Sequence, residues 1–184
     1  MGGTDPDVGP GADAVTRALL AHNRWANEQL IDACEGLEIA ALDREFEMGL
    51  GTIRKTVTHI LSAIDGWAAV LAKREVGDPL EQRRAVTPAD WRALSREVND
   101  DFDAAALSGP MDEVLSASRR GQSFEFVRGQ VIAHVTTHGV HHRAQCVNML
   151  RHVRGEIPKS AVIEWIFSGS PGLLPGDGSG SAGA

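Results

Sequence analysis

Apolar residues return every three to four positions through four long segments of this chain. This period is typical of amphipathic α-helices, which bury one apolar side against their neighbours. The segments span residues 13–36, 52–74, 87–107 and 126–153. No run of alternating polar and apolar residues indicates a strand with comparable clarity. We therefore predict an all-α fold, a four-helix bundle with a long connection between helices three and four.

The connection between the third and fourth predicted helices differs from the rest of the chain. From Gly109-Pro110 to Gly121 the helical periodicity is poor, so we expect an extended connection or a short hairpin there. A link of this length also allows a crossover, so simple up-down-up-down connectivity is not implied. Residues 160–167 (SAVIEWIF) form a last apolar element, either a helical turn or a strand.

Both ends of the chain differ in composition from its centre. Residues 1–11 are rich in Gly, Asp and Pro, and residues 168–184 are almost wholly Gly, Ser, Ala and Pro. Such segments bury too little apolar surface to offset the entropy that is lost on ordering them. We expect flexible tails at 1–11 and 168–184 and a single domain at 12–167.

The overall charge argues against a nucleic-acid partner. Eighteen Lys and Arg residues against twenty-five Asp and Glu residues give a formal net charge of −7, which opposes approach to a phosphate backbone. No apolar run approaches the ~20 residues that a membrane helix needs. The N-terminal sequence MGGTDPDVGPG has neither the basic region nor the apolar core of a secretory signal. We expect a cytoplasmic protein with no membrane partner and with reduced Cys34 and Cys146.

Histidine is concentrated in the last predicted helix, which carries five of the seven histidines. At about 100° per residue, His138 and His142 fall within an apolar stripe and are predicted to be buried. Residues four apart stack on one face, so this pair can offer two nitrogens to one metal ion. The other three histidines, which project toward the flank of the stripe or toward solvent, are His134, His141 and His152.

A third ligand must come from another helix, where the remaining histidines are His22 and His59. His59 borders the apolar stripe of the second predicted helix, whereas His22 lies among polar neighbours in HNRWANEQ. A site of His59, His138 and His142 is neutral and leaves coordination positions open, which is typical of catalytic metal sites. The alternative is that the histidines are packing residues and that no metal binds.

Three residues near the predicted ligands are candidates to orient a ligand or a substrate: His141, Arg143 and Gln145. The alternative for each is a position on a solvated flank of the helix. Cys146 lies about 12 Å along the helix axis from His138, too far to share one ion with it. The four tryptophans are expected in the core or in a dimer interface rather than against a substrate.

Three short motifs, in order along the chain, resemble those of the DinB superfamily of helical-bundle metalloproteins. They are HNRWANEQL in the first predicted helix, TIRKTVTHI followed by Trp67 in the second, and HGVHHRAQ in the fourth. The resemblance covers most of residues 14–167. It implies a four-helix bundle, commonly homodimeric, that holds a divalent ion, often nickel or zinc. By position, the ligands that it implies are His59, His138 and His142, the residues that the helix-wheel argument also selects.

The resemblance also implies candidate functions, all with a small-molecule substrate. Several relatives transfer groups to or from low-molecular-weight thiols, others are described as metal-dependent hydrolases, and many have no known activity. A hydrolase needs a nearby general base, and no HExxH-type glutamate accompanies HGVHH. We therefore favour a metal-dependent transferase with a small thiol as cosubstrate. A hydrolase and a non-catalytic metal-binding bundle are the alternatives.

Overall fold

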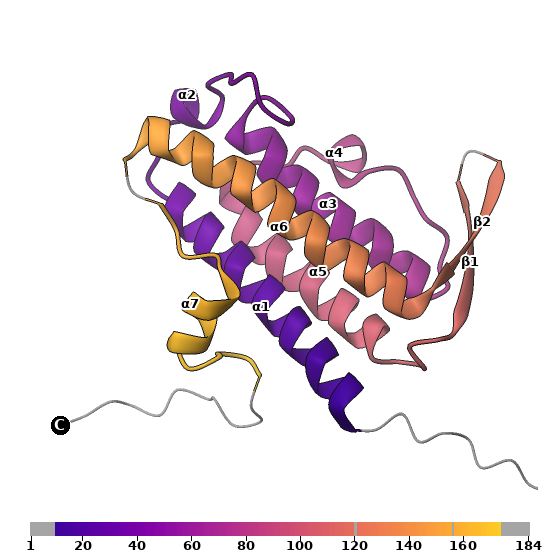
Figure 1. The fold of residues 1–184 in the computed structure, drawn as a ribbon. Helices are drawn as coiled ribbons and strands as arrows, with labels where there is room; N and C mark the ends of the chain where they lie inside the picture. The colour runs from indigo at the N-terminus through magenta and orange to yellow at the C-terminus, as the bar shows by residue number, and fades with distance from the viewer. Residues whose placement is uncertain (1–9, 120, 156, 174–184) are drawn as a thin grey trace, which may run out of the picture.

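The computed structural model describes residues 10–119, 121–155 and 157–173. Four long helices lie side by side: α1 (Pro10–Cys34), α3 (Ile53–Leu71), α5 (Trp91–Ala106) and α6 (Arg128–Val153) (Figure 1). Shorter elements connect or flank them: α2 (Ile39–Leu42), α4 (Leu80–Arg83), the 3₁₀ turn η1 (Pro88–Asp90) and α7 (Val162–Phe167). The described part of the chain is mainly helical, as the sequence predicts.

Local signals place the helix starts close to their predicted positions. The Thr52 hydroxyl accepts a hydrogen bond from the backbone N–H of Lys55 at 3.1 Å and so caps α3. Before α5, the Asp90 carboxylate accepts from the backbone N–H and the hydroxyl of Thr87, at 2.8 and 2.7 Å. The predicted start at Thr87 therefore holds, although the first turn is the 3₁₀ turn η1.

The connection between α5 and α6 contains a β-hairpin, one of the two forms that the sequence predicts. Strand β1 (Val114–Arg119) pairs antiparallel with β2 (Gln122–Val127), in a register that sets Leu115 opposite Phe126 and Ala117 opposite Phe124. The last apolar element, which the sequence left undecided, is the helix α7. None of the helices in the described ranges has the length and hydropathy needed to cross a membrane.

The crossover lies between α3 and α5, whereas the sequence analysis considered one between the third and fourth predicted helices. The Trp91 indole donates to Thr58 Oγ1 at 3.2 Å, and Arg74 pairs with Asp101 beyond the other end of α3. These contacts show that α3 and α5 run in the same direction. The link through α4, residues 72–87, therefore returns along the molecule, whereas the hairpin joins the adjacent ends of α5 and α6 (Figure 1). Periodicity does not report helix direction, so this feature was not predictable from it.

The core is shared by all four long helices. Helix α3 packs against α5 and α6, and α1 packs against the same two, so α1 and α3 occupy opposite corners. Both cysteines, Cys34 and Cys146, are buried and unbridged in this core. Burial raises the pKa of the Cys34 thiol to about 12, so both behave as the small buried side chains that the sequence predicts.

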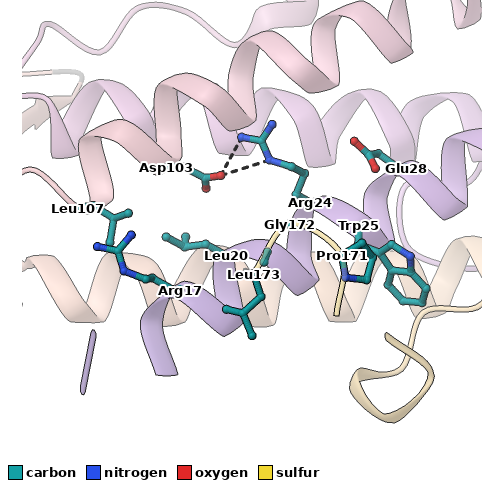
Figure 2. A pocket seen from close by; sticks show the side chains of 11 residues that line it. Arg17, Leu20, Arg24, Trp25, Glu28, Asp103, Leu107, Pro171, Gly172 and Leu173 are labelled. Carbon is teal, nitrogen blue, oxygen red and sulfur yellow. Dashed lines mark hydrogen bonds and ion pairs between the residues drawn. The ribbon is translucent and has the colours of Figure 1, made fainter. Parts of the chain in front are cut away.

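Packing of the C-terminal segment against α1 continues beyond residue 167, where the sequence predicts that the domain ends. Trp165 of α7 is buried beside Trp25 of α1, and Leu173 packs against this pair. The Trp165 indole donates to the carbonyl of Pro171 at 3.2 Å. Figure 2 shows Pro171 and Leu173 beside α1, at the edge of a cavity of about 340 Å³ that Arg24 also lines. Residues 174–184 of the predicted tail, and residues 1–9, lie outside the described residues.

A buried arginine fixes the hairpin to the start of α6. The Arg128 side chain is 2% exposed and forms an ion pair with Glu113, the residue that precedes β1. Its Nη1 also donates to the carbonyl of Ala105, near the end of α5. One side chain thus ties together the end of α5, the hairpin and the start of α6.

We predict that Arg128→Leu lowers the free energy of unfolding by about 2–3 kcal/mol, because the Ala105 carbonyl and the Glu113 carboxylate each lose a charged donor and keep only Ser108 and Lys73 as partners. Arg96 is exposed on α5, so Arg96→Leu is the matched control and should change stability little. Urea unfolding followed by circular dichroism compares the two variants. Equal stability of both would show that this contact does not hold the hairpin.

Candidate metal centre

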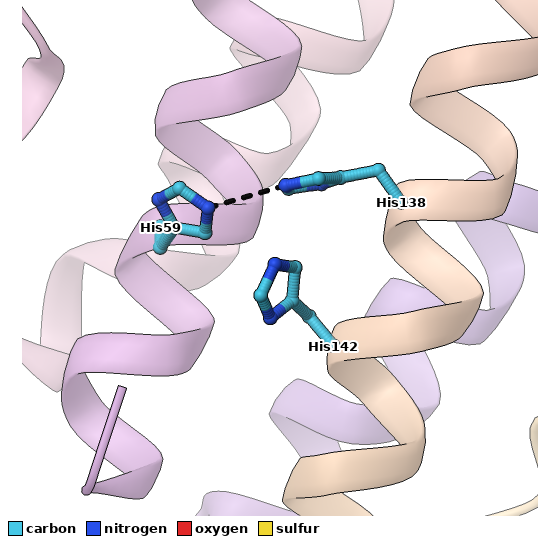
Figure 3. Close-up of side chains that lie close together, drawn as sticks. All are labelled: His59, His138 and His142. Carbon is cyan, nitrogen blue, oxygen red and sulfur yellow. Dashed lines mark hydrogen bonds between the residues drawn. The ribbon is translucent and has the colours of Figure 1, made fainter. Parts of the chain in front are cut away.

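Three histidine side chains meet between α3 and α6. His59 projects from α3, and His138 and His142 project from successive turns of α6 (Figure 3). The Nε2 atoms of His59 and His138 are 3.2 Å apart, and the ring centroids of the three pairs are 4.3–5.0 Å apart. One nitrogen from each ring lies within 4.8 Å of the other two. The structure therefore brings together the three residues selected from the sequence.

The spacing of these nitrogens suits one divalent ion. Zinc at about 2.0–2.1 Å from two imidazole nitrogens, at the tetrahedral angle, places those nitrogens about 3.4 Å apart. The separation of the His59 and His138 Nε2 atoms, 3.2 Å, is close to this value. A donor set of imidazoles without a carboxylate suits zinc or nickel. The cluster can thus hold a metal ion and leave coordination positions free for other ligands.

The histidines of the cluster are in the protonation state that a metal requires. Burial, together with its histidine neighbours, lowers the pKa of His138 to about 4. Burial also lowers the pKa of His59 and of His142. All three imidazoles are therefore neutral at pH 7, and only a neutral imidazole has the lone pair that binds a metal.

The helix-wheel argument placed His138 and His142 too deep. Both are only half-buried, at the margin of the buried stripe of α6. The centre of that stripe is occupied instead by Gly139 and Arg143, which continue the buried row from Val135. A shift of one residue rotates the helix by about 100°, enough to move the pair from the core to its margin. There His138 lines a cleft that a small molecule can enter.

Gln145 holds His142 in one tautomer. His142 Nδ1 donates to Gln145 Oε1 at 2.9 Å, which leaves the lone pair on His142 Nε2. The Gln145 amide nitrogen donates to His141 Nε2 at 3.0 Å, so the carboxamide is held at both ends. Gly49 lies directly against this amide, and a Cβ at Gly49 would overlap Gln145 Oε1. Two of the three candidate orienting residues, His141 and Gln145, therefore lie beside the cluster.

Arg143, the third candidate, lies elsewhere. Its guanidinium is buried in the interface between α1 and α6, where Nη1 donates to Asn23 Oδ1 at 2.7 Å and to Asn27 Oδ1 at 2.8 Å. Burial lowers the pKa of Arg143 to about 10, so it is still cationic at pH 7. Through these contacts the Arg143 side chain joins α6 to α1. It does not reach the histidine cluster.

The remaining sequence candidates do not join the cluster. His22 is buried, 3.0 Å from the carbonyl of Ser160 through its Nε2, and its ring packs against Trp25 and Trp165. Cys146 is fully buried in the core, where desolvation raises the pKa of its thiol. Among the described histidines, His59 is therefore the one from another helix that faces the α6 pair.

The cluster opens onto a cleft of about 510 Å³ between α3, α6 and the hairpin, with His59 and His138 in its wall. Trp67 lines the same cleft, with its ring edge-on to Phe126 at 5.1 Å between centroids. The other tryptophans are buried, as expected, but Trp67 is half-exposed in this wall. The sequence did not predict that Trp67 lines a cleft, because it lies on the apolar stripe of α3 and the hairpin that completes the cleft is distant in sequence.

Comparison with known proteins identifies a family. The model of the DinB family matches residues 12–159, a range that contains the hairpin, the cleft and all three clustered histidines. No curated protein matches the chain.

We predict that His59→Ala lowers zinc affinity at least 100-fold, because it removes one of three ligands, whereas His22→Ala leaves affinity within about threefold of wild type. Isothermal titration with zinc, on protein purified without an affinity tag, measures both. Circular dichroism verifies that each variant is folded. A larger loss in His22→Ala than in His59→Ala would contradict the assignment of the third ligand.

Proposed function

This chain belongs to the DinB family, and from that premise we propose that it is a metal-dependent transferase acting with a low-molecular-weight thiol. Helices α1, α3, α5 and α6 would form the family's four-helix bundle. His59, His138 and His142 would hold the divalent ion, zinc or nickel. The observation that best supports this proposal is a neutral three-histidine cluster, two members of which, His59 and His138, lie in the wall of an open cleft.

The neutrality of the cluster matters for the chemistry. A divalent ion held by three uncharged ligands keeps its full positive charge, which lowers the pKa of a bound thiol or water. The protein's own contribution is to fix the ligand geometry. Gln145 holds the His142 ring through Nδ1, and the packing of α3 against α6 holds His59 opposite the pair.

His134 is the group best placed to accept the thiol proton. Its ring lies 5.5 Å from that of His138 and lines the same cleft. Its side chain is exposed and makes no hydrogen bond within the described ranges. In the transfer, the sulfur forms a bond to an electrophilic carbon and the leaving group departs with the electrons of the broken bond. The thiol proton passes to a His134 ring nitrogen and from there to solvent.

One observation favours the hydrolase alternative. Glu81 of α4 lines the cleft with His59, and its negative charge opposes the lowering of the His59 pKa by burial. A carboxylate in this position can act as the general base that the helix α6 motif lacks. The sequence could not reveal it, because α4 approaches the cluster only through the crossover link.

The expected partners are a small-molecule substrate and a second copy of the chain. The homodimer rests on the family resemblance alone, and sedimentation equilibrium tests it directly. The cytoplasmic location and the absence of a nucleic-acid partner likewise stay predictions from the sequence.

We predict that Gln145→Ala lowers zinc affinity about 10- to 100-fold, because His142 loses the acceptor that fixes its tautomer. Gln145→Glu keeps an acceptor oxygen at the same position and should retain affinity within a few-fold. Competition with a chelator of known zinc affinity measures both variants. Wild-type affinity in Gln145→Ala would show that this contact does not support a metal ligand.

The proposed reaction is tested with metal-loaded protein, glutathione or cysteine as the thiol, and 1-chloro-2,4-dinitrobenzene as the electrophile. We expect thiol-dependent turnover that falls at least 100-fold in His142→Ala. Hydrolysis of 4-nitrophenyl acetate without thiol, lost in the same variant, would support the hydrolase instead. Metal binding with neither activity would support the non-catalytic bundle.

A further inference from the structure

Two arginines are fully buried in the described part of the chain, and only one of them has a counter-charge there. Arg128 forms an ion pair with Glu113. Arg143 is 2% exposed, and its hydrogen-bond acceptors are the neutral amide oxygens of Asn23 and Asn27. Burial lowers the pKa of Arg143 only to about 10, so it stays cationic at pH 7. A buried cation without a counter-charge is strongly destabilising.

The titratable groups around Arg143 do not supply the missing negative charge. Those that lie near enough for their charges to interact with it are His22 and Cys146. Burial lowers the pKa of His22 and raises that of the Cys146 thiol, so both are uncharged at pH 7. No described carboxylate acts on the pKa of Arg143. The interface between α1 and α6 therefore carries a positive charge that its own described side chains do not neutralise.

The Arg143 nitrogens that lack an acceptor form one edge of the guanidinium. Nη1 donates to both asparagines, whereas Nε and Nη2 have no hydrogen-bond partner within the described ranges. In a guanidinium these two nitrogens direct parallel N–H bonds to the same side and bind anions bidentately. Asn27 Nδ2 is also buried and lacks an acceptor in those ranges, although Asn27 Oδ1 accepts from Nη1. An unused bidentate fork thus accompanies the unneutralised charge.

From this combination we propose that the Arg143 fork binds one chloride ion, enclosed between α1 and α6. Nε and Nη2 are fully buried, so the anion is small and has no part in solvent. A halide accepts hydrogen bonds from any direction and can therefore serve both nitrogens of the fork. A water molecule could accept from the fork as well, but it would leave the charge of the guanidinium uncompensated. The inference is independent of the proposed function.

The stability of the full-length protein in chloride tests the proposal. Sodium chloride replaces sodium gluconate at constant ionic strength, and urea unfolding is followed by circular dichroism. An anion that binds only the folded chain stabilises it by mass action. With the site saturated, we expect the unfolding equilibrium constant to fall about tenfold for each tenfold rise in chloride. Stability that does not depend on chloride would overturn the proposal, because bound water gives no such dependence.

Three variants separate this site from a general effect of the salt. Asn27→Asp places a carboxylate where Oδ1 already accepts from Arg143 at 2.8 Å, so the dependence on chloride should disappear. Asn148→Asp makes the same change at a half-buried position of α6 and should keep the full dependence. Arg143→Met removes the fork and should also lose the dependence; if it does not fold, Asn27→Asp decides alone. Equal dependence in wild type and Asn27→Asp would overturn the assignment.

Crystals grown in sodium bromide locate the anion directly through its anomalous scattering. We expect a bromide peak beside Nε and Nη2 of Arg143 in wild type and none in Asn27→Asp. An ordered water molecule in its place would overturn the proposal. Bromide at the fork without any dependence of stability on chloride would indicate an adventitious ion only, and would overturn the proposal as well.

Discussion

The antiparallel packing of α3 against α6 is the constraint on which the candidate centre depends. Helix α6 carries two adjacent rows of side chains. The row through Val131, Val135 and Leu150 is buried in the core, which fixes the rotation of the helix about its axis. The neighbouring row, His134, His138 and His142, is then held at the edge of the core, opposite His59 and Trp67 of α3. The apolar contacts thus position the polar ones, as ridges and grooves set the geometry of packed helices.

A buried polar contact between α6 and α1 also fixes the rotation of α6 about its axis. The Arg143 guanidinium bonds to Asn23 and Asn27 of α1, while its Nε and Nη2 atoms have no hydrogen-bond partner among the described residues. Gly139 leaves room for this contact, because a Cβ at residue 139 would lie 2.5 Å from Asn23 Oδ1. A cation that is costly to bury has few alternative positions. Its two hydrogen bonds to asparagines of α1 constrain how α6 lies against that helix.

The parts of the site that the sequence predicts are the local ones. Residues His138 and His142 stack because of helix geometry alone, and few histidines elsewhere could complete a cluster with them. The residues missed are those brought in by tertiary connections. Trp67 becomes part of a cleft only when the hairpin covers it, and Glu81 enters through the crossover. Arg143 was misplaced because a charged residue on a helix is usually solvated, and no periodicity indicates that two asparagines of α1 will accept from it.

The central claim is that His59, His138 and His142 bind one metal ion, and elemental analysis of protein prepared without an affinity tag or nickel resin tests it most directly. Wild type and His138→Ala are purified in parallel, then offered zinc, nickel, manganese and iron after removal of any bound metal. The account predicts about one equivalent of metal in wild type and none in the variant, with the same helical circular dichroism. Wild-type protein without metal, or equal metal content in both, would contradict it.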